Sequence, residues 1–382
     1  MSTHAMMTTS LHSGSVPPSN APFSYVPGNR FDRFEIVEQY RYGAFKEVYL
    51  AKDVEHDLGG QYLCVLKVVK SLDKILDTSL MAPAGTATYN LGYLRDQVGT
   101  ARVRREKFEQ ETTIMRKRLS GCTSVAQIIH QGIFSVPGMT YDNEVLYFVE
   151  EYIPGETFAD LLTRAGPLSP ETALVLFRQV AEAILPIHKN DVAHRDVKGS
   201  NILVVPEGTG GLGVERVAFT DFGNSAVVGS RYTQVGSILY RSPEQLKGKG
   251  FPGGQKSDMW ALGVLFYQAL SGNYPFATLQ PDWGSLPADH VRHQKDQLRD
   301  QIAHGKIPLP FPHPTRDLEF HLNAVIVGRP SKSTTPIALT HRDSKYLLSN
   351  KHPYLLDRRR ERRSNANAFV KRLRALERIY RG

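Results

Sequence analysis

Residues 193–204 read AHRDVKGSNILV, and within this short stretch lie an acid, two bases and a carboxamide. Asp196 can accept a proton from a hydroxyl group, and Lys198 can meet the negative charge of a phosphoryl group during its transfer. Asn201 supplies a side-chain oxygen of the kind that Mg²⁺ accepts. Five fixed residue types at this spacing arise by chance on the order of 10⁻⁴ of the time in a chain of ordinary composition. The stretch therefore predicts a phosphoryl-transfer site.

The same stretch resembles the catalytic loop of the eukaryotic-type protein kinases. The matching residues are His194, Arg195, Asp196, Lys198 and Asn201. Asp221-Phe222-Gly223 follows 20 residues after Asn201, and Ser242-Pro243-Glu244 closes the segment after it, in the order of the family. The resemblance covers about residues 31–380. It implies an α+β fold with two lobes, a small antiparallel sheet lobe and a mostly helical lobe.

The resemblance also implies a reaction, the transfer of the γ-phosphoryl group of ATP, with Mg²⁺, to Ser or Thr hydroxyls of protein substrates. In that reaction Asp196 orients the hydroxyl and takes its proton, while Asn201 and Asp221 hold the metal. Lys198 counts as a fourth catalytic residue. Lys198 together with Ser237, which follows Gly236, favours Ser/Thr substrates over tyrosine.

The nucleotide-binding side departs from the family at the glycine-rich hairpin. Of the three family glycines only Gly43 is present, and Arg41 and Lys46 stand at the other two positions. Glycine lets backbone N–H groups approach phosphates closely. Either basic side chain could supply charge instead. Val48, on the strand that follows, is expected to contact adenine.

A single lysine, Lys67, lies inside the apolar strand predicted at residues 63–69. A buried charge needs a partner. By resemblance Lys67 holds the α- and β-phosphates and pairs with Glu111 on a helix, with Glu109 as the rival partner. At the hinge between the lobes, the backbone groups of Glu151 and Ile153 are expected to bind adenine. That alignment places Glu150, an unusual polar residue, at the gatekeeper position.

The expected domain organisation has three parts. Residues 1–30 form a disordered tail, because residues 1–29 contain no Asp, Glu, Lys or Arg and are rich in Ser, Thr and Pro. Residues 31–153 form the N-lobe, with an insertion at about 73–103. Residues 154–382 form the C-lobe, with a long insertion at about 277–360. Within the C-lobe, Asp258 is expected to hold the catalytic-loop backbone, and Arg362 or Arg363 to pair with Glu244.

The chain ends in a basic segment, since residues 351–382 hold 11 Lys or Arg against three Asp or Glu. Such a cluster could meet nucleic acid or an acidic partner. Apolar residues at helical spacing instead favour a closing amphipathic helix with a solvated basic face. Those residues are Phe369, Leu373, Leu376 and Tyr380.

Composition favours a cytoplasmic protein. Cys64 and Cys122 are the only cysteines, too few for a disulfide framework, and the start of the chain lacks the pattern of a signal peptide. The most apolar run, 259–270, is shorter than the roughly 20 residues that span a bilayer, so no membrane span is expected.

Two alternatives compete with an active protein kinase. A pseudokinase scaffold is motivated by the altered glycine hairpin, and a small-molecule phosphotransferase would share the Asp-x₄-Asn chemistry. The segment 236–244 and the helix predicted from Asp258 speak against the second alternative, since the family uses those features for protein substrates. If the chain is an active kinase, Thr233 is a candidate phosphorylation site facing Arg195, with fixed contacts of the loop as the competing possibility.

Overall fold

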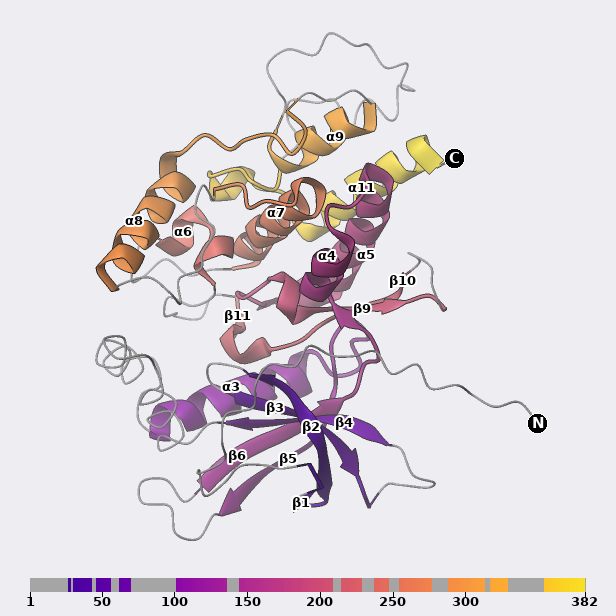
Figure 1. The fold of residues 1–382 in the computed structure, drawn as a ribbon, viewed down its shortest axis with the longest axis vertical. Coiled ribbons are helices and arrows are strands. Elements are labelled where there is room, and N and C mark those ends of the chain that lie inside the picture. Colours follow the sequence, from indigo (N-terminus) through magenta and orange to yellow (C-terminus); the bar gives the residue numbers. More distant parts are fainter. Residues whose placement is uncertain are drawn as a thin grey trace, which may run out of the picture.

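The computed structural model describes residues 27–28, 30–42, 46–55, 62–69, 101–135, 144–208, 214–228, 237–246, 254–276, 288–312, 317–328 and 354–381. These residues form two lobes, one built on a sheet and the other mostly of helices, with the C-terminus on the helical lobe (Figure 1). The α+β, two-lobed architecture expected from the sequence is confirmed.

The N-lobe is built on an antiparallel sheet whose six described strands follow the order β1-β2-β3-β4-β6-β5. They are β1 (Arg30–Phe31), β2 (Phe34–Tyr42), β3 (Lys46–Asp53), β4 (Leu63–Val69), β5 (Ile128–Ser135) and β6 (Glu144–Glu151). Strand β4 has the bounds that the sequence predicts. The strands are rich in β-branched and aromatic residues, which favour extended backbone.

The two faces of this sheet have different partners, because side chains alternate along each strand. One face carries a cluster of buried apolar side chains that includes Phe34, Leu66 and Tyr147. On the other face Val48, Lys67 and Phe148 are aligned across β3, β4 and β6. Helix α3 (Ala101–Arg118) covers part of that second face through Phe108, whose ring centroid lies 6.0 Å from that of Phe148.

Helix α3 also links the two lobes. Phe108 belongs to the small cluster against β6, whereas Ile114, Met115 and Leu119 belong to the large core of the C-lobe. The helix begins at Ala101, inside the insertion expected at 73–103; residues 73–100 lie outside the described residues. A helix held by both lobes can position a side chain at the boundary between them.

The C-lobe contains seven described α-helices around one core. They are α4 (Phe158–Ala165), α5 (Pro170–Lys189), α6 (Pro243–Leu246), α7 (Gln255–Ser271), α8 (Ala288–His304), α9 (Asp317–Ile326) and α11 (Ala366–Arg381). Local sequence sets their starts: Thr157 makes a capping box at α4, and Ser169 caps α5 just before Pro170. Helix α7 is buried along most of its length, as its nearly continuous apolar sequence predicts.

Short strands and turns lie where the two lobes meet. The strands are β7 (Glu156–Thr157), β8 (Val192–Ala193), β9 (Ile202–Pro206), β10 (Val214–Phe219) and β11 (Ala226–Val227). The 3₁₀ turns are η1 (Gly199–Asn201), η2 (Phe222–Asn224) and η3 (Ile238–Tyr240), with η4 (Arg360–Arg362) farther along the chain. Strand β9 pairs with both β10 and β7, and β8 pairs with β11. These pairings bring residues 194–201 next to residues 220–225.

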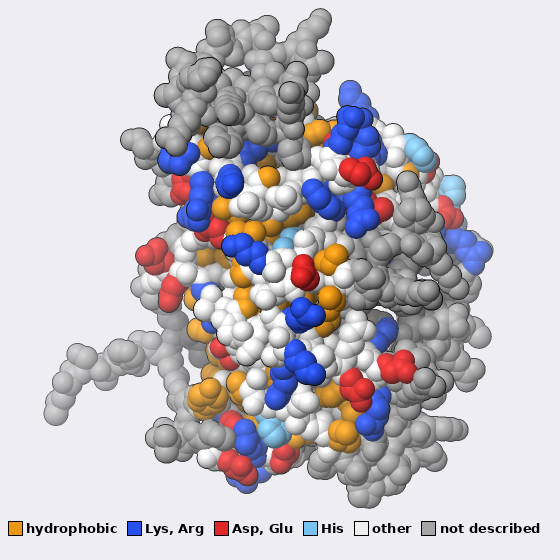
Figure 2. All heavy atoms as spheres, turned by 180° about the vertical axis from the view of Figure 1, so that it is seen from behind, with side chains coloured by type: hydrophobic (Ala, Val, Ile, Leu, Met, Phe, Trp, Pro, Cys, Tyr) orange, Lys and Arg blue, Asp and Glu red, His pale blue; other side chains and the backbone are white. Residues whose placement is uncertain are grey.

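Helix α11 closes the C-lobe against α5. Phe369, Leu373 and Leu376 are buried, and the Tyr380 hydroxyl lies 3.0 Å from Nδ1 of His321. The amphipathic closing helix predicted from the sequence is therefore confirmed. Figure 2, which shows the molecule from behind, has Lys and Arg side chains on both lobes interspersed with Asp and Glu. Among the described residues of that face, the basic side chains do not gather into one patch.

The segment expected as an insertion at 277–360 contains α8 and α9. Leu298 and Ile302 of α8 and Leu322 of α9 are buried in the C-lobe core. These helices are therefore part of the folded lobe. Across the described ranges, none of the helices has both the length and the apolar character that crossing a membrane requires.

Candidate active site

The turn that carries the candidate catalytic residues is hydrogen-bonded to Asp258 of α7. Its carboxylate, in a residue 1% exposed, accepts the backbone N–H of His194 at 2.9 Å and that of Arg195 at 2.7 Å. The backbone of Arg195 has a φ of 67°, a conformation that residues other than glycine rarely adopt. Two charge-assisted hydrogen bonds stabilise this turn, which confirms the structural role expected for Asp258.

His194 connects the turn to the segment that carries Asp221. Its Nε2 lies 3.1 Å from the carbonyl oxygen of Thr220, and the backbone N–H of Asp196 points to its Nδ1 at 3.3 Å. A carbonyl only accepts and an amide N–H only donates, so the proton of the neutral ring lies on Nε2. The ring also packs 4.7 Å from that of Phe222. Asp196 and Asp221 are thereby fixed to one another through a single imidazole.

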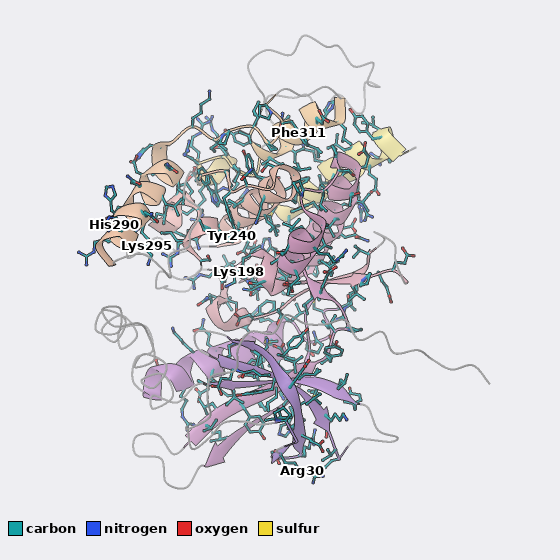
Figure 3. All side chains as sticks on the ribbon, viewed as in Figure 1. Arg30, Lys198, Tyr240, His290, Lys295 and Phe311 are labelled. Atoms are coloured by element: carbon teal, nitrogen blue, oxygen red, sulfur yellow. The ribbon has the colours of Figure 1, made fainter. Side chains whose placement is uncertain are left out.

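Asp196 lies at the centre of a set of hydrogen-bond donors. Its Oδ1 accepts the backbone N–H of Ser237 at 3.0 Å, and its Oδ2 lies 3.1 Å from Nζ of Lys198 and 3.3 Å from Nδ2 of Asn201. Lys198 lies where the C-lobe faces the N-lobe, with Tyr240 nearby (Figure 3). The three residues predicted from the catalytic-loop sequence are thus brought together, and the Ser237 backbone joins them.

Asn201 and Asp221 are brought together by the β9–β10 pair. Ile202 lies opposite Phe219, and the N–H of Thr220 donates to the carbonyl of Asn201 at 3.0 Å. The Asn201 amide nitrogen donates to the carbonyl of Asp196 at 2.8 Å, so the Asn201 side-chain oxygen is the atom that can bind a cation.

One amide oxygen and one carboxylate fit Mg²⁺, which usually binds one or two carboxylates, substrate phosphates and water. In the described part of the chain, no cluster of three or more His, Cys, Asp and Glu could hold a metal by itself. The donor set therefore suits a metal that arrives with a nucleotide.

Lys46 makes the ion pair that the sequence assigned to Lys67. Its Nζ lies 2.5 Å from Oε1 of Glu111 and 3.0 Å from Oδ1 of Asp221. Glu111 is buried, whereas its rival Glu109 is exposed, so the choice of Glu111 on α3 is right but the expected lysine is wrong. Lys46 lies opposite Val69, at the end of the sheet face that α3 covers, and this brings it closer to Glu111 than the sequence resemblance suggested.

Electrostatics in this trio favour the charged forms of Lys46 and Asp221. Burial lowers the pKa of Lys46, but the charges of Glu111 and Asp221 outweigh it and raise the pKa well above its ordinary value. Burial raises the pKa of Asp221, yet Lys46 and Lys67 together hold that pKa far below its usual range. Asp221 is therefore a carboxylate throughout the physiological pH range.

Lys67 instead pairs with Glu150, the residue at the gatekeeper position. Lys67 Nζ lies 2.7 Å from Oε2 of Glu150 and 3.0 Å from Oγ1 of Thr220. Lys67 is 4% exposed and Glu150 is 1% exposed. The pair explains the polar gatekeeper, which sequence reasoning left without a purpose. A signal was present, because β4 and β6 each carry a buried charge of opposite sign among apolar neighbours.

Gly223 lies directly against the Lys46 trio. A Cβ atom at this position would lie 3.3 Å from Nζ of Lys46 and 3.3 Å from Oε2 of Glu111. Both distances are tighter than ordinary van der Waals contact, so a side chain at this position would require the ends of Lys46 and Glu111 to shift by a few tenths of an ångström. The glycine of the Asp-Phe-Gly motif thus leaves room for Lys46.

The other predicted nucleotide contacts lie along the hinge and β3. The Glu151 N–H donates to the carbonyl of Gln127 at 2.9 Å, and its side chain binds Arg216 at 2.8 Å. Ile153 is 2% exposed and packs with Leu203 in a small cluster. Val48 is half-buried on the face that carries Lys67, and Gly43 lies outside the described residues.

Two further expectations concern the segment after Asp221. Arg363, not Arg362, pairs with Glu244: its Nη1 and Nη2 lie 2.7 and 3.1 Å from the two carboxylate oxygens. Arg195 donates through Nη1 to the carbonyl of Asn224 at 3.3 Å, a contact that ties it to η2. Thr233, its proposed phosphorylated partner, lies outside the described residues.

Comparison with known proteins agrees with this geometry. The family model of the protein kinase domain matches residues 97–311. The serine/threonine-protein kinase PrkC of Bacillus subtilis is 31% identical over 186 residues, which are 47% of this chain and 27% of that protein. Serine/threonine-protein kinase A of Synechocystis is 29% identical over 290 residues, 72% of this chain and 47% of that protein. The chain thus spans between about a quarter and a half of the length of these relatives.

Proposed function

The chain is a member of the protein kinase family, and from this premise we propose that it transfers the γ-phosphoryl group of ATP to Ser and Thr hydroxyls of proteins, with Mg²⁺ as the metal. The observation that carries the proposal is the surroundings of Asp196. Its carboxylate contacts the Ser237 N–H, Lys198 and Asn201. Its backbone N–H donates to His194, whose other ring nitrogen contacts the Thr220 carbonyl, next to Asp221. A base, a nearby lysine and a metal-binding asparagine are groups that phosphoryl transfer uses.

Asp196 acts as the base in this proposal. It accepts a hydrogen bond from the substrate hydroxyl and takes the proton as the hydroxyl oxygen bonds to the γ-phosphorus. The bond from the γ-phosphorus to the bridging oxygen breaks, and ADP leaves with that electron pair. Lys198 lies within hydrogen-bond distance of Asp196 and can offset the negative charge of the phosphoryl group as it moves.

Asn201 and Asp221 would hold Mg²⁺ through the amide oxygen and the carboxylate. Bound there, the metal offsets charge on the phosphate oxygens. The low pKa of Asp221, in which Lys46 and Lys67 outweigh the effect of burial, keeps this ligand ionised. On the nucleotide side, the carbonyl of Glu151 and the backbone of Ile153 are proposed to bind adenine, with Val48 against the ring. The Glu151 N–H already donates to Gln127, so its carbonyl is the group proposed for adenine.

The test is phosphoryl transfer from [γ-³²P]ATP to a generic basic protein, in the presence and absence of Mg²⁺. Wild type is compared with Asp196→Asn, and the label is identified by phosphoamino acid analysis. The matched control is Asp296→Asn, the same substitution at an exposed position on α8. We expect label on Ser or Thr, at a rate reduced about 10²- to 10⁴-fold by Asp196→Asn and unchanged by the control.

Three outcomes would count against the proposal. Wild-type protein that binds nucleotide without transferring phosphate would be a scaffold. Label found on tyrosine alone would contradict the Ser/Thr specificity. Equal transfer by wild type and Asp196→Asn would show that this turn is not the catalytic site.

A further inference from the structure

The site contains two lysines, the buried Lys67 and the half-buried Lys46, where one is needed to contact nucleotide phosphates. Lys46 lies on β3 and Lys67 on β4, and both side chains point to the sheet face that meets α3 and the C-lobe. Each has one closely paired glutamate, Glu111 for Lys46 and Glu150 for Lys67. The two pairs are not equivalent, because they face different parts of the site.

We propose that Lys46, and not Lys67, contacts the phosphates of the nucleotide, and that Lys67 forms a fixed ion pair with Glu150 in the wall of the pocket. The inference rests on the proposed function, because it assigns a residue to the nucleotide site of that reaction. It assigns the phosphate contact to the hairpin position where the family has a glycine.

Lys46 bridges α3 to the carboxylate proposed to bind metal. Its Nζ contacts Glu111 at 2.5 Å and Asp221 at 3.0 Å. Phosphates that share a cation with Asp221 must come close to that carboxylate, and therefore close to Lys46. An ammonium has three N–H donors, of which these two contacts use two.

Lys67 also uses two of its three N–H donors, but neither of its partners is proposed to bind metal or phosphate. It contacts Oε2 of Glu150 at 2.7 Å and Oγ1 of Thr220 at 3.0 Å. The second carboxylate oxygen of Glu150, Oε1, is buried and has no hydrogen-bond partner among the described residues. Glu150 is 1% exposed. If Lys67 turned away to a phosphate, the Glu150 carboxylate would become a buried charge without a partner, which is strongly unfavourable. Lys46 faces no such penalty, because Asp221 and Glu111 would remain paired while it contacts phosphate.

The altered glycine hairpin has a purpose in this arrangement. Where the family uses close approach of backbone N–H groups, a lysine at position 46 supplies a positive charge. Gly223 leaves the space that this side chain occupies, since a Cβ there would lie 3.3 Å from Nζ of Lys46.

The test separates a phosphate contact from a structural effect by comparing ligands with and without phosphates. A fluorescent ATP analogue is displaced from the protein by ATP, by ADP and by adenosine, and each affinity is measured for every variant. Removing a phosphate contact weakens ATP and ADP but not adenosine, whereas general damage to the pocket weakens all three. Circular dichroism and thermal melting establish that each variant is folded.

The variants are Lys46→Met and the double variant Lys67→Met/Glu150→Met, which removes both charges of the second pair and leaves no buried charge unpaired. We expect Lys46→Met to weaken ATP and ADP about tenfold or more relative to adenosine. The double variant should keep the ratio of ATP to adenosine affinity within about threefold, because neither changed residue contacts phosphate in this arrangement. If the methionine pair does not fold, Lys67→Gln/Glu150→Gln retains hydrogen-bonding groups without charge and makes the same comparison.

Either of two results would overturn the assignment. The first is an equal loss for all three ligands in Lys46→Met, which would make Lys46 a structural residue. The second is a folded double variant that loses its preference for ATP over adenosine, which would make Lys67 the phosphate ligand. Failure of the proposed function would give a different result from failure of this assignment. The variants would then change ATP, ADP and adenosine affinity as predicted, but wild type would transfer no phosphate from [γ-³²P]ATP.

Discussion

Replacing Arg363 by Met should destabilise the C-lobe strongly, because this guanidinium is buried and fully engaged. Arg363 is 0% exposed and binds both oxygens of Glu244, at 2.7 and 3.1 Å. It also donates to the carbonyls of Asp357 at 3.0 Å and Lys256 at 2.7 Å, and it lies 5.0 Å above the ring of Trp260. Methionine fills much of the volume but makes none of the polar contacts.

The expected loss in the free energy of unfolding is about 3–5 kcal/mol at pH 7, the usual cost of breaking a buried ion pair from one side. Most of that cost comes from Glu244, which is left as a buried carboxylate. A second substitution that removes this charge, Glu244→Met, should therefore make the double variant more stable than Arg363→Met alone. The coupling free energy from the double-mutant cycle isolates the pair.

The pH dependence has a definite sign. Burial raises the pKa of Glu244, but hydrogen bonds and charge from Arg363 outweigh it and lower the pKa below its ordinary value. A lowered folded-state pKa contributes stability that is present above the ordinary pKa and is lost as the pH falls toward the folded value. In Arg363→Met burial should dominate and raise the pKa, so the protonated carboxyl relieves the damage in acid. The difference between wild type and variant should thus begin to narrow above pH 4.5, as the pH falls through the raised pKa of the variant. It should narrow further below about 4.5, as wild type loses the contribution of its own lowered pKa.

Urea titrations followed by tryptophan fluorescence suit this measurement, since the buried Trp260 lies under the guanidinium. Arg363→Lys provides the conservative comparison, with the charge retained and the bidentate geometry lost. A loss below about 1 kcal/mol in Arg363→Met, or a double variant no more stable than the single one, would refute the reasoning.

Three other outcomes are expected. Asp258→Asn should lower kcat about tenfold or more and leave nucleotide affinity unchanged, because it weakens the two hydrogen bonds that shape the turn before Asp196. Steady-state kinetics and nucleotide titration measure the two quantities. A change in nucleotide affinity without a change in kcat would contradict the prediction. Gly223→Ala should slow phosphoryl transfer and lower the free energy of unfolding by less than about 1 kcal/mol, since its Cβ would press on the flexible ends of Lys46 and Glu111. Full activity would show that the ion pair tolerates the displacement. Leu373→Ala, on the buried side of α11, should cost about 2–5 kcal/mol in urea titrations, whereas the exposed Arg374→Ala should cost under 1 kcal/mol.

Much of the fold and of the candidate site could be predicted because the relevant residues are close in the sequence. Asp196, Lys198 and Asn201 lie within six residues, so a single turn of the chain can bring them together. Helical and strand periodicity likewise fixes which side chains of α11 and β4 are buried, because each period is a property of the local backbone. The pairing of Asp258 with the turn and of Glu244 with an arginine followed from the resemblance.

The sequence by itself determined the two-lobed fold, the candidate catalytic turn and the presence of two lysines and two glutamates near the proposed nucleotide site. Only the tertiary structure decided which lysine meets which glutamate. That choice depends on the register of β3, β4 and β6, on the position of α3 along the sheet, and on the distance from each ammonium to each carboxylate. A change of a few ångströms exchanges the partners of Lys46 and Lys67, because attraction between charges in a buried site falls with distance while the cost of leaving one unpaired stays high. The spacing of these residues in the sequence does not determine the distance from each ammonium to each carboxylate. The packing of α3 between the lobes determines it.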